Sequence, residues 1–183
     1  QTYRFNLIDT PGHVDFTYEV SRSMRACEGA ILVVDATQGV EAQTVANAYL
    51  AVDNRLEIVP VLNKVDMAGA DIPGVTRQIE DLLDIGMGEH LHISAKTGQN
   101  VPEVLEAIVH HVPPPRTRGA QAPLRALVFD SVFDIFRGVV VYVRVVDGSL
   151  RVGDSVRLMS NGVTTQIREV GIFSPSQKQV ERL

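Results

Sequence analysis

Short apolar runs alternate with helix-like stretches over the first 112 residues, and this alternation limits the possible folds more than any other feature. The runs fall at residues 3–8, 30–36, 57–63 and 91–95. Continuous runs rich in Val and Ile are typical of strands covered on both faces, as in a parallel sheet. Strands that alternate with helices favour a doubly wound α/β sheet.

The segments between the runs carry apolar residues at helical spacing, which predicts helices that cover the sheet. A short helix is expected after the first loop, with Val20 and Met24 facing the core. The other stripes are Val45, Ala48, Tyr49 and Val52 in residues 41–54; Val75, Ile79, Leu82 and Leu83 in a helix that stops at Gly86; and Val101, Leu105, Ile108 and Val112 in residues 100–112.

Three consecutive prolines at 113–115 cannot continue a helix and favour a stiff connector. After them the apolar period changes to two, which predicts antiparallel strands at 124–133, 138–150, 154–159 and 163–173. Asp147-Gly148 and Asn161-Gly162 are strong hairpin signals between such strands. We therefore expect one domain at 1–112, a linker at 113–122, and part of a small antiparallel β-barrel at 123–183.

The charge distribution supports two units. Residues 1–112 carry 7 Lys and Arg against 16 Asp and Glu, whereas residues 113–183 carry 10 against 6. The basic second part suits an RNA-facing surface or an ordinary solvated one. The single cysteine, Cys27, excludes an internal disulfide framework and fits a reducing compartment.

Three short polar motifs follow expected strands, at the edge where α/β sheets bind ligands. The first is Asp9-Thr10-Pro11-Gly12. A carboxylate at Asp9 can hold Mg²⁺ through water, and Gly12 lets a backbone amide approach a terminal phosphate. Taken alone, the same four residues also make a good ordinary turn.

The second and third motifs are Asn63-Lys64-Val65-Asp66 and Ser94-Ala95-Lys96. The Asp66 carboxylate can accept two hydrogen bonds from guanine, whereas adenine has no donors in that arrangement and leaves the carboxylate unpaired. Lys64 can lay its stem across the base, and the Ala95 amide can donate to the guanine carbonyl oxygen. Together with the first motif, the order and spacing predict a guanine-nucleotide site.

His13 directly follows the glycine expected at the terminal phosphate. A polar side chain there can orient the attacking water in phosphoryl transfer, where positioning and electrostatics dominate. A histidine in a loop can equally be a plain surface residue. Because the three motifs accompany it, we predict that His13 is the catalytic residue.

The motifs Asp-Thr-Pro-Gly-His, Asn-Lys-Val-Asp and Ser-Ala-Lys resemble those of translational GTPases. The connecting stretches at 8–51, 126–148 and 157–175, with the proline linker, resemble the elongation factor 4 (LepA) family. That resemblance implies GTP or GDP and Mg²⁺ as ligands, with Asp9 binding the metal and His13 orienting the attacking water. The residues implied to bind the guanine are Asn63, Lys64, Asp66, Ser94, Ala95 and Lys96.

The resemblance also implies what the intact protein does. It would be a ribosome-dependent GTPase of protein synthesis, hydrolysing GTP to GDP and phosphate in back-translocation or fidelity. The implied partners are ribosomal RNA and proteins, and tRNA-bearing complexes through domains beyond this chain. DNA is not an implied partner, and a monomer is expected in solution. The implied location is cytoplasmic, or peripheral on the cytoplasmic face of the bacterial plasma membrane.

Two alternatives stay open. The chain can belong to another translational GTPase, similar to elongation factor G or BipA. It can also act, in isolation, as a non-catalytic module that binds the ribosome or RNA. In elongation factor G the second motif is typically Asn-Lys-Met-Asp followed by Arg, whereas here Asp66 precedes Met67.

One part of the family pattern has no counterpart in these 183 residues. A phosphate-binding loop requires Gly-x-x-x-x-Gly-Lys followed by Ser or Thr. None of the three lysines, Lys64, Lys96 and Lys178, follows a glycine. We therefore expect an internal fragment whose GTPase sheet lacks the strand leading to that loop, and which is inactive by itself.

Overall fold

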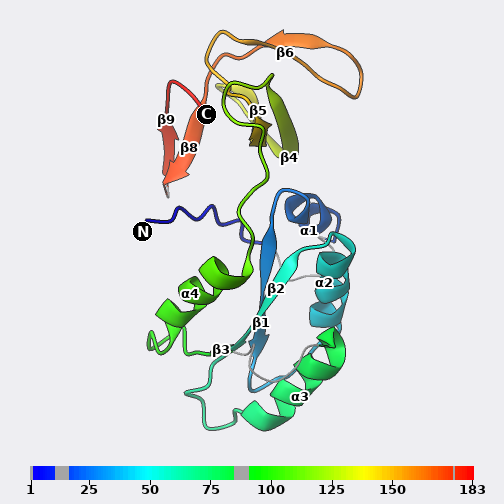
Figure 1. The fold of residues 1–183 in the computed structure, drawn as a ribbon, viewed down its shortest axis with the longest axis vertical. Coiled ribbons are helices and arrows are strands. Elements are labelled where there is room, and N and C mark those ends of the chain that lie inside the picture. The colour runs from blue at the N-terminus through cyan, green and yellow to red at the C-terminus, as the bar shows by residue number, and fades with distance from the viewer. Residues whose placement is uncertain (1, 11–16, 85–90, 175) are drawn as a thin grey trace. The chain divides into compact units, whose positions relative to one another are not determined.

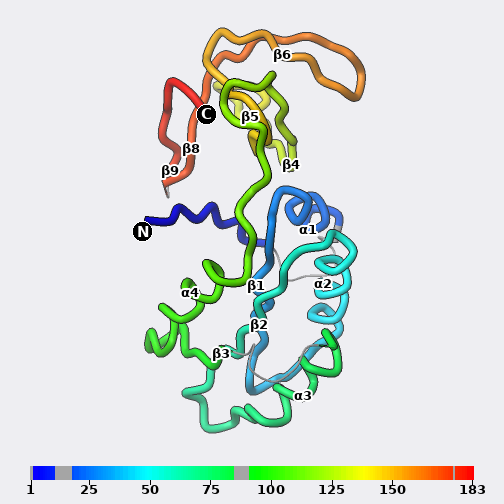
Figure 2. The backbone as a smooth tube through the Cα atoms, in the orientation of Figure 1, coloured from blue at the N-terminus to red at the C-terminus, as the bar shows by residue number. Residues whose placement is uncertain are grey.

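The computed structural model describes residues 2–10, 17–84, 91–174 and 176–183. The chain divides into two compact units, unit 1 (Gln1–Pro115) and unit 2 (Arg116–Leu183). The division falls directly after the three prolines, and Figure 2 lets the reader follow the backbone from one unit into the next. Within the described part of the chain, no helix is long and apolar enough to cross a membrane.

Unit 1 is an α/β structure around a three-stranded parallel sheet (Figure 1). The strands β1 (Gly29–Asp35), β2 (Glu57–Asn63) and β3 (Leu91–His92) pair in that order. The register between β1 and β2 runs from Gly29 opposite Glu57 to Asp35 opposite Asn63. Parallel pairing therefore places Asp35 and Asn63 side by side at the carboxyl end of the sheet, and the predicted α/β class is confirmed.

Helices cover both faces of this sheet. They are α1 (Thr17–Met24), α2 (Ala42–Asp53), α3 (Ile72–Leu83) and α4 (Val101–His111). Figure 1 shows α4 on one side of the sheet and α2 and α3 on the other. The Asp71 side chain caps α3 by accepting from the Gly74 amide at 3.0 Å, and the helix ends before Asp84, whose φ of 53° is left-handed.

Three buried apolar clusters hold unit 1 together. Because burial of apolar surface is the main favourable term in folding, these clusters fix the helices on the sheet. Val20 and Met24 on α1 face the core, as predicted. The clusters consist of Val34, Leu62, Val75 and Ile79; of Val59, Val61, Ile93 and Val104; and of Val20, Met24 and Ala51.

Two of the predicted helical stripes are partly wrong. On α2 the buried residues are Ala48 and Ala51, whereas Tyr49 and Val52 are more than half exposed. On α4 the buried residue is Val104, whereas Leu105 is 48% exposed. Small alanines allow α2 to lie close to its neighbours, so the larger apolar side chains beside them stay at the margin of the contact.

The strand predicted at residues 3–8 is also wrong, since residues 2–10 form no helix or strand. Tyr3, Phe5 and Leu7 are exposed, Leu7 by 82%. A strand needs a neighbour to satisfy its backbone groups. In the described sheet β1 is an edge strand, and no segment pairs with its outer side.

Unit 2 consists of two-stranded antiparallel sheets. They pair β4 (Arg125–Asp134) with β5 (Gly138–Asp147), β6 (Ser155–Arg157) with β7 (Thr164–Gln166), and β8 (Gly171–Ser174) with β9 (Ser176–Gln179). The turn at Asn161-Gly162 joins β6 to β7, as predicted, with Gly162 at φ 76°.

The hairpin predicted at Asp147-Gly148 is wrong. The partner of β5 is β4, and the Gly148 amide donates to the Gly119 carbonyl oxygen at 3.1 Å. Gly148 has a φ of 74°, and a Cβ there would lie 2.5 Å from the Ala122 carbonyl oxygen. The turn is therefore packed against the segment that precedes β4, which only glycine permits.

Candidate functional site

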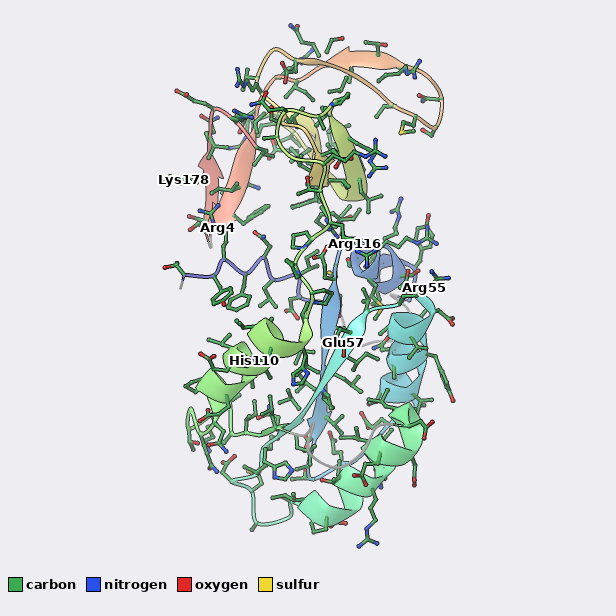
Figure 3. The ribbon with its side chains drawn as sticks, in the orientation of Figure 1. Arg4, Arg55, Glu57, His110, Arg116 and Lys178 are labelled. Carbon is green, nitrogen blue, oxygen red and sulfur yellow. The ribbon has the colours of Figure 1, made fainter. Side chains whose placement is uncertain are left out.

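The polar residues at the ends of β1 and β2 gather at one edge of the unit 1 sheet. Glu57, labelled in Figure 3, begins β2, and Asn63 ends it. The Ile93 amide donates to the Leu62 carbonyl oxygen at 2.7 Å, and the Val65 amide donates to the Ile93 carbonyl oxygen at 3.2 Å. The chain after β3 therefore runs directly beside the loop that follows β2.

Asn63 links these two loops. Its Oδ1 accepts a hydrogen bond from the Lys64 amide at 2.8 Å and another from the Ala95 amide at 3.0 Å. Ser94 is fully buried, and its Oγ accepts from the Thr97 amide at 3.1 Å, which closes the second loop on itself. The structure thus brings the Asn63–Asp66 and Ser94–Lys96 motifs together.

Lys64 adopts a left-handed backbone with φ 68°, which is uncommon for a residue other than glycine. Its ammonium group forms an ion pair with Asp35, which ends the neighbouring strand. Such backbone strain persists only where the surroundings enforce it, and it clusters at functional sites. Two such constraints act on Lys64: the hydrogen bond from its backbone amide to Asn63 Oδ1 and the ion pair from its side chain to Asp35.

Asp35 is a site residue that the sequence analysis missed. Its Oδ1 accepts hydrogen bonds from the amide and the hydroxyl of Thr37, at 2.8 and 2.7 Å. The hydrogen bond from Lys64, with smaller help from Thr37, lowers the pKa of Asp35 from 3.8 to about 2. The signal was available in the sequence, because Asp35 ends an apolar strand just as Asn63 does.

The groups predicted to meet the base are accessible. Asp66 and Lys96 are exposed, and the Lys64 side chain is 53% exposed. The Ala95 amide, predicted to donate to guanine, donates here to Asn63. Donation to a base therefore requires this amide to share or exchange its acceptor.

The first motif is described only in part. Pro11, Gly12 and His13 lie outside the described residues. Asp9 and Thr10 are exposed and belong to no strand. Where both partners are described, no hydrogen bond or ion pair joins Asp9 or Thr10 to the other two motifs.

A metal site made wholly of protein side chains is not found among residues 2–10, 17–84, 91–174 and 176–183, because no three His, Cys, Asp or Glu groups converge there. Mg²⁺ in nucleotide-binding proteins is usually held by one or two protein ligands together with phosphates and water. The exposed carboxylate of Asp9 fits that ligand set.

Comparison with known proteins shows the family of the chain. A family model for the elongation factor Tu GTP binding domain matches residues 1–114. The chain is 58% identical over 183 residues to elongation factor 4 of Synechococcus elongatus, and 59% identical over 175 residues to elongation factor 4 of Lactococcus lactis subsp. lactis.

These matches cover 100% and 96% of this chain but only 30% and 29% of the two relatives. The chain thus spans about 30% of the length of the curated relatives it matches. The family model covers more than half of the chain, including all three motifs. The chain therefore belongs to the elongation factor Tu GTP-binding domain family, and its resemblance to elongation factor 4 is confirmed.

Proposed function

We propose that this chain carries the guanine-recognition side of a ribosome-dependent GTPase of the elongation factor 4 kind. The observation that supports this most directly is Asn63, whose Oδ1 holds the Lys64 and Ala95 amides at once. Two loops that recognise one flat ring must be fixed relative to each other, and preorganisation of this kind favours binding. The relatives named elongation factor 4 support the same class.

In this proposal Asp66 reads the base. Its exposed carboxylate accepts from the ring N–H and the exocyclic amine of guanine, and adenine leaves it unpaired. Lys64 covers the ring with its aliphatic stem, while Ser94, Ala95 and Lys96 form the opposing loop. Asn63 is the residue that keeps the two loops in register.

The first motif serves the phosphates. Asp9 would hold Mg²⁺ through water, and the ion, when bound, would offset negative charge on the phosphates. Gly12, preceded by Thr10 and Pro11, would let a backbone amide approach the γ-phosphate, and His13 would orient the attacking water. These roles rest on the sequence pattern and on family membership.

We further propose that residues 1–112 form part of a GTP-binding domain whose phosphate-loop strand is not among these residues. The unpartnered outer edge of β1 in the described sheet supports this. Residues 113–122 would be the linker, and residues 123–183 part of a β-barrel domain. The whole protein would work in the cytoplasm as a monomer, with the ribosome and its tRNA-bearing complexes as partners.

The test is the base preference of Asp66→Asn in the full-length protein. An asparagine amide faces the guanine amine with a donor, so affinity for GTP and GDP should fall by about a hundredfold or more. Xanthine nucleotides, which carry a carbonyl oxygen in place of that amine, should gain affinity. Equilibrium titration with fluorescent nucleotides measures both changes.

The matched control is Asp53→Asn, which removes an exposed carboxylate at the end of α2. It should leave the affinity for all nucleotides unchanged. If Asp66→Asn binds GTP as tightly as the unaltered protein, the assignment of this edge to guanine is wrong. GTP hydrolysis with and without ribosomes then tests the activity of the whole protein.

A further inference from the structure

We propose that Asp35 is a positioning residue of the guanine site: through its ion pair it holds the Lys64 side chain in place before a nucleotide binds. This inference rests on the proposed function, because it assigns Lys64 to the base. It adds Asp35, the last residue of β1, which belongs to none of the three motifs.

The carboxylate of Asp35 is itself firmly held. Its Oδ1 is occupied by the two hydrogen bonds from Thr37, which leaves Oδ2 for the Lys64 ammonium. Only 16% of the Asp35 side chain is exposed. The carboxylate therefore offers one oxygen in one direction, and Lys64 occupies it.

The turn that carries Asp35 is anchored to the core. The Gly39 amide donates to the Asp35 carbonyl oxygen at 2.8 Å, with Gly39 at φ 78°. The Gln78 side chain, on α3 next to the fully buried Ile79, accepts from the Val40 amide at 2.8 Å. A Cβ at Gly39 would lie 2.6 Å from Gln78 Oε1, so the turn lies directly against α3.

The β1 and β2 ends are also tied to each other. The Ala36 amide donates to the Asn63 carbonyl oxygen at 2.9 Å, so the residue after Asp35 is fixed against the residue before Lys64. Both partners of the ion pair thus come from strand ends whose spacing is set by the sheet. The pair is preformed by the fold and needs no ligand to assemble it.

A purely stabilising role explains this arrangement less well. Ion pairs with a half-exposed partner contribute little to folding, because water screens them and both side chains lose freedom. Lys64 is such a partner, and it also has a left-handed backbone. A lysine already held beside the base loses less rotamer freedom when the ligand arrives, and its paired charge leaves the aliphatic stem as the surface offered to the ring.

The experiment is a double-mutant cycle in the full-length protein, read as affinity for fluorescent GDP and GTP. Asp35→Asn keeps the shape and an oxygen for Thr37 but removes the charge. We expect it to weaken the binding of both nucleotides equally, by about fivefold, because the guanine ring is common to them. In the Lys64→Met background, which keeps an aliphatic stem, Asp35→Asn should lower the nucleotide affinity by less than about twofold.

A merely structural role gives a different result, since Asp35→Asn would then lower affinity by the same factor in both backgrounds. That additivity, or an unchanged affinity in the single variant, overturns the proposal. Ribosome-stimulated hydrolysis supplies a second readout: KM for GTP should rise while kcat at saturating GTP stays constant, and a fall in kcat alone contradicts positioning.

Thr37→Val is the second variant, in case Asp35→Asn fails to fold. It removes the hydrogen bond from the Thr37 hydroxyl to Asp35 Oδ1 and should lower the affinity for GDP by about two- to threefold. In the Lys64→Met background it should leave the affinity unchanged. An equal effect in both backgrounds overturns the proposal. Asp66→Asn in the same assay keeps the two hypotheses apart, because unchanged guanine preference there refutes the guanine site itself, whereas an additive cycle refutes only the role of Asp35.

Discussion

Unit 1 and unit 2 hold their loops in place by different means. Unit 1 has three buried apolar clusters, and its site loops leave strands that those clusters fix. In unit 2 the described residues that are buried are Asp147, Leu150 and Val170. The end of β4 and the turn that follows it instead expose Phe133, Ile135 and Phe136, by 75%, 80% and 90%.

Polar contacts take over in unit 2. Asp147 is 4% exposed, accepts from the Arg118 amide at 2.7 Å, and pairs with Arg125 at 3.0 Å. Arg137, in the turn between β4 and β5, donates to the Gln177 side chain on β9 at 2.6 Å. The comparison indicates that buried apolar clusters fix the strands that carry the site, whereas in unit 2 polar contacts add to a smaller set of buried residues.

The largest expected effect comes from the core of unit 1. Ile79→Ala removes a side chain with no exposed surface, and a cavity of this kind costs about 3 kcal/mol. Hydrogen exchange of the full-length protein, read by mass spectrometry, should show amides of β2 and α3 exchanging about a hundredfold faster. Amides of β4 and β5 should keep their rates.

The matched change in unit 2 is Phe136→Ala, which removes a larger side chain that is 90% exposed. It should change stability by less than about 0.5 kcal/mol, as surface substitutions usually do. If Phe136→Ala accelerates exchange as much as Ile79→Ala does, the contrast between the two units is not one of burial.

The second effect tests the polar tie of unit 2. Asp147→Ala leaves the Arg118 amide without its acceptor and Arg125 without its partner, at a cost of about 2 kcal/mol. Exchange should accelerate at residues 116–119 and 147–150, and unit 1 should be unaffected. Asp130→Ala is the control, because Asp130 is exposed and accepts from the amide of its neighbour Ser131.

The same contrast explains what the sequence predicted. The structure confirms the strands at 30–36 and 57–63 and the helices of unit 1. Their apolar residues recur at strand or helix spacing, and this spacing marks the face that becomes buried. The strand at 3–8 had a similar pattern, but its formation depends on a neighbour, which no local pattern contains. On α2 the pattern did not separate Ala48 and Ala51 from Tyr49, because close approach selects small side chains over the most apolar ones.

Part of the candidate site was also readable from the sequence. Asn63, Lys64, Ser94 and Ala95 were found because each motif follows a strand, and the structure brings them together. The link through Asn63 Oδ1 was not predictable, since it depends on the register of β2 and β3. Asp147 shows the same limit in unit 2: it looked like a hairpin residue, and tertiary contacts gave it another role.

A third, smaller effect tests the link between the site loops. Asn63→Ala removes the acceptor of the Lys64 and Ala95 amides, and solvent can partly replace it, so the cost is about 1 kcal/mol. Exchange should accelerate at residues 64–66 and 94–97 while β1 and the first turns of α3 stay protected. Global unfolding of unit 1 in place of this local change would show that Asn63 is part of the fold itself.

The smallest expected effect concerns the pKa of one aspartate in each unit. Asp35 in unit 1 has its pKa lowered to about 2, first by the Lys64 side chain. Asp134 in unit 2 also has a lowered pKa, caused first by the Arg137 amide and then by the Phe136 amide. One acid thus depends on a partner side chain and the other on the backbone of its own turn.

Acid titration distinguishes these causes. Because the folded pKa of Asp35 lies below its ordinary value of 3.8, its contribution is complete above that pH and is lost as the pH falls toward about 2. For an ion pair with a half-exposed lysine this contribution is at most about 1 kcal/mol. Carboxyl NMR of Lys64→Met should show the pKa of Asp35 moving toward its ordinary value. The pKa of Asp134 should stay in place, because the Arg137 and Phe136 amides still donate to it. If both acids shift together, the two units are coupled, and the contrast between them fails.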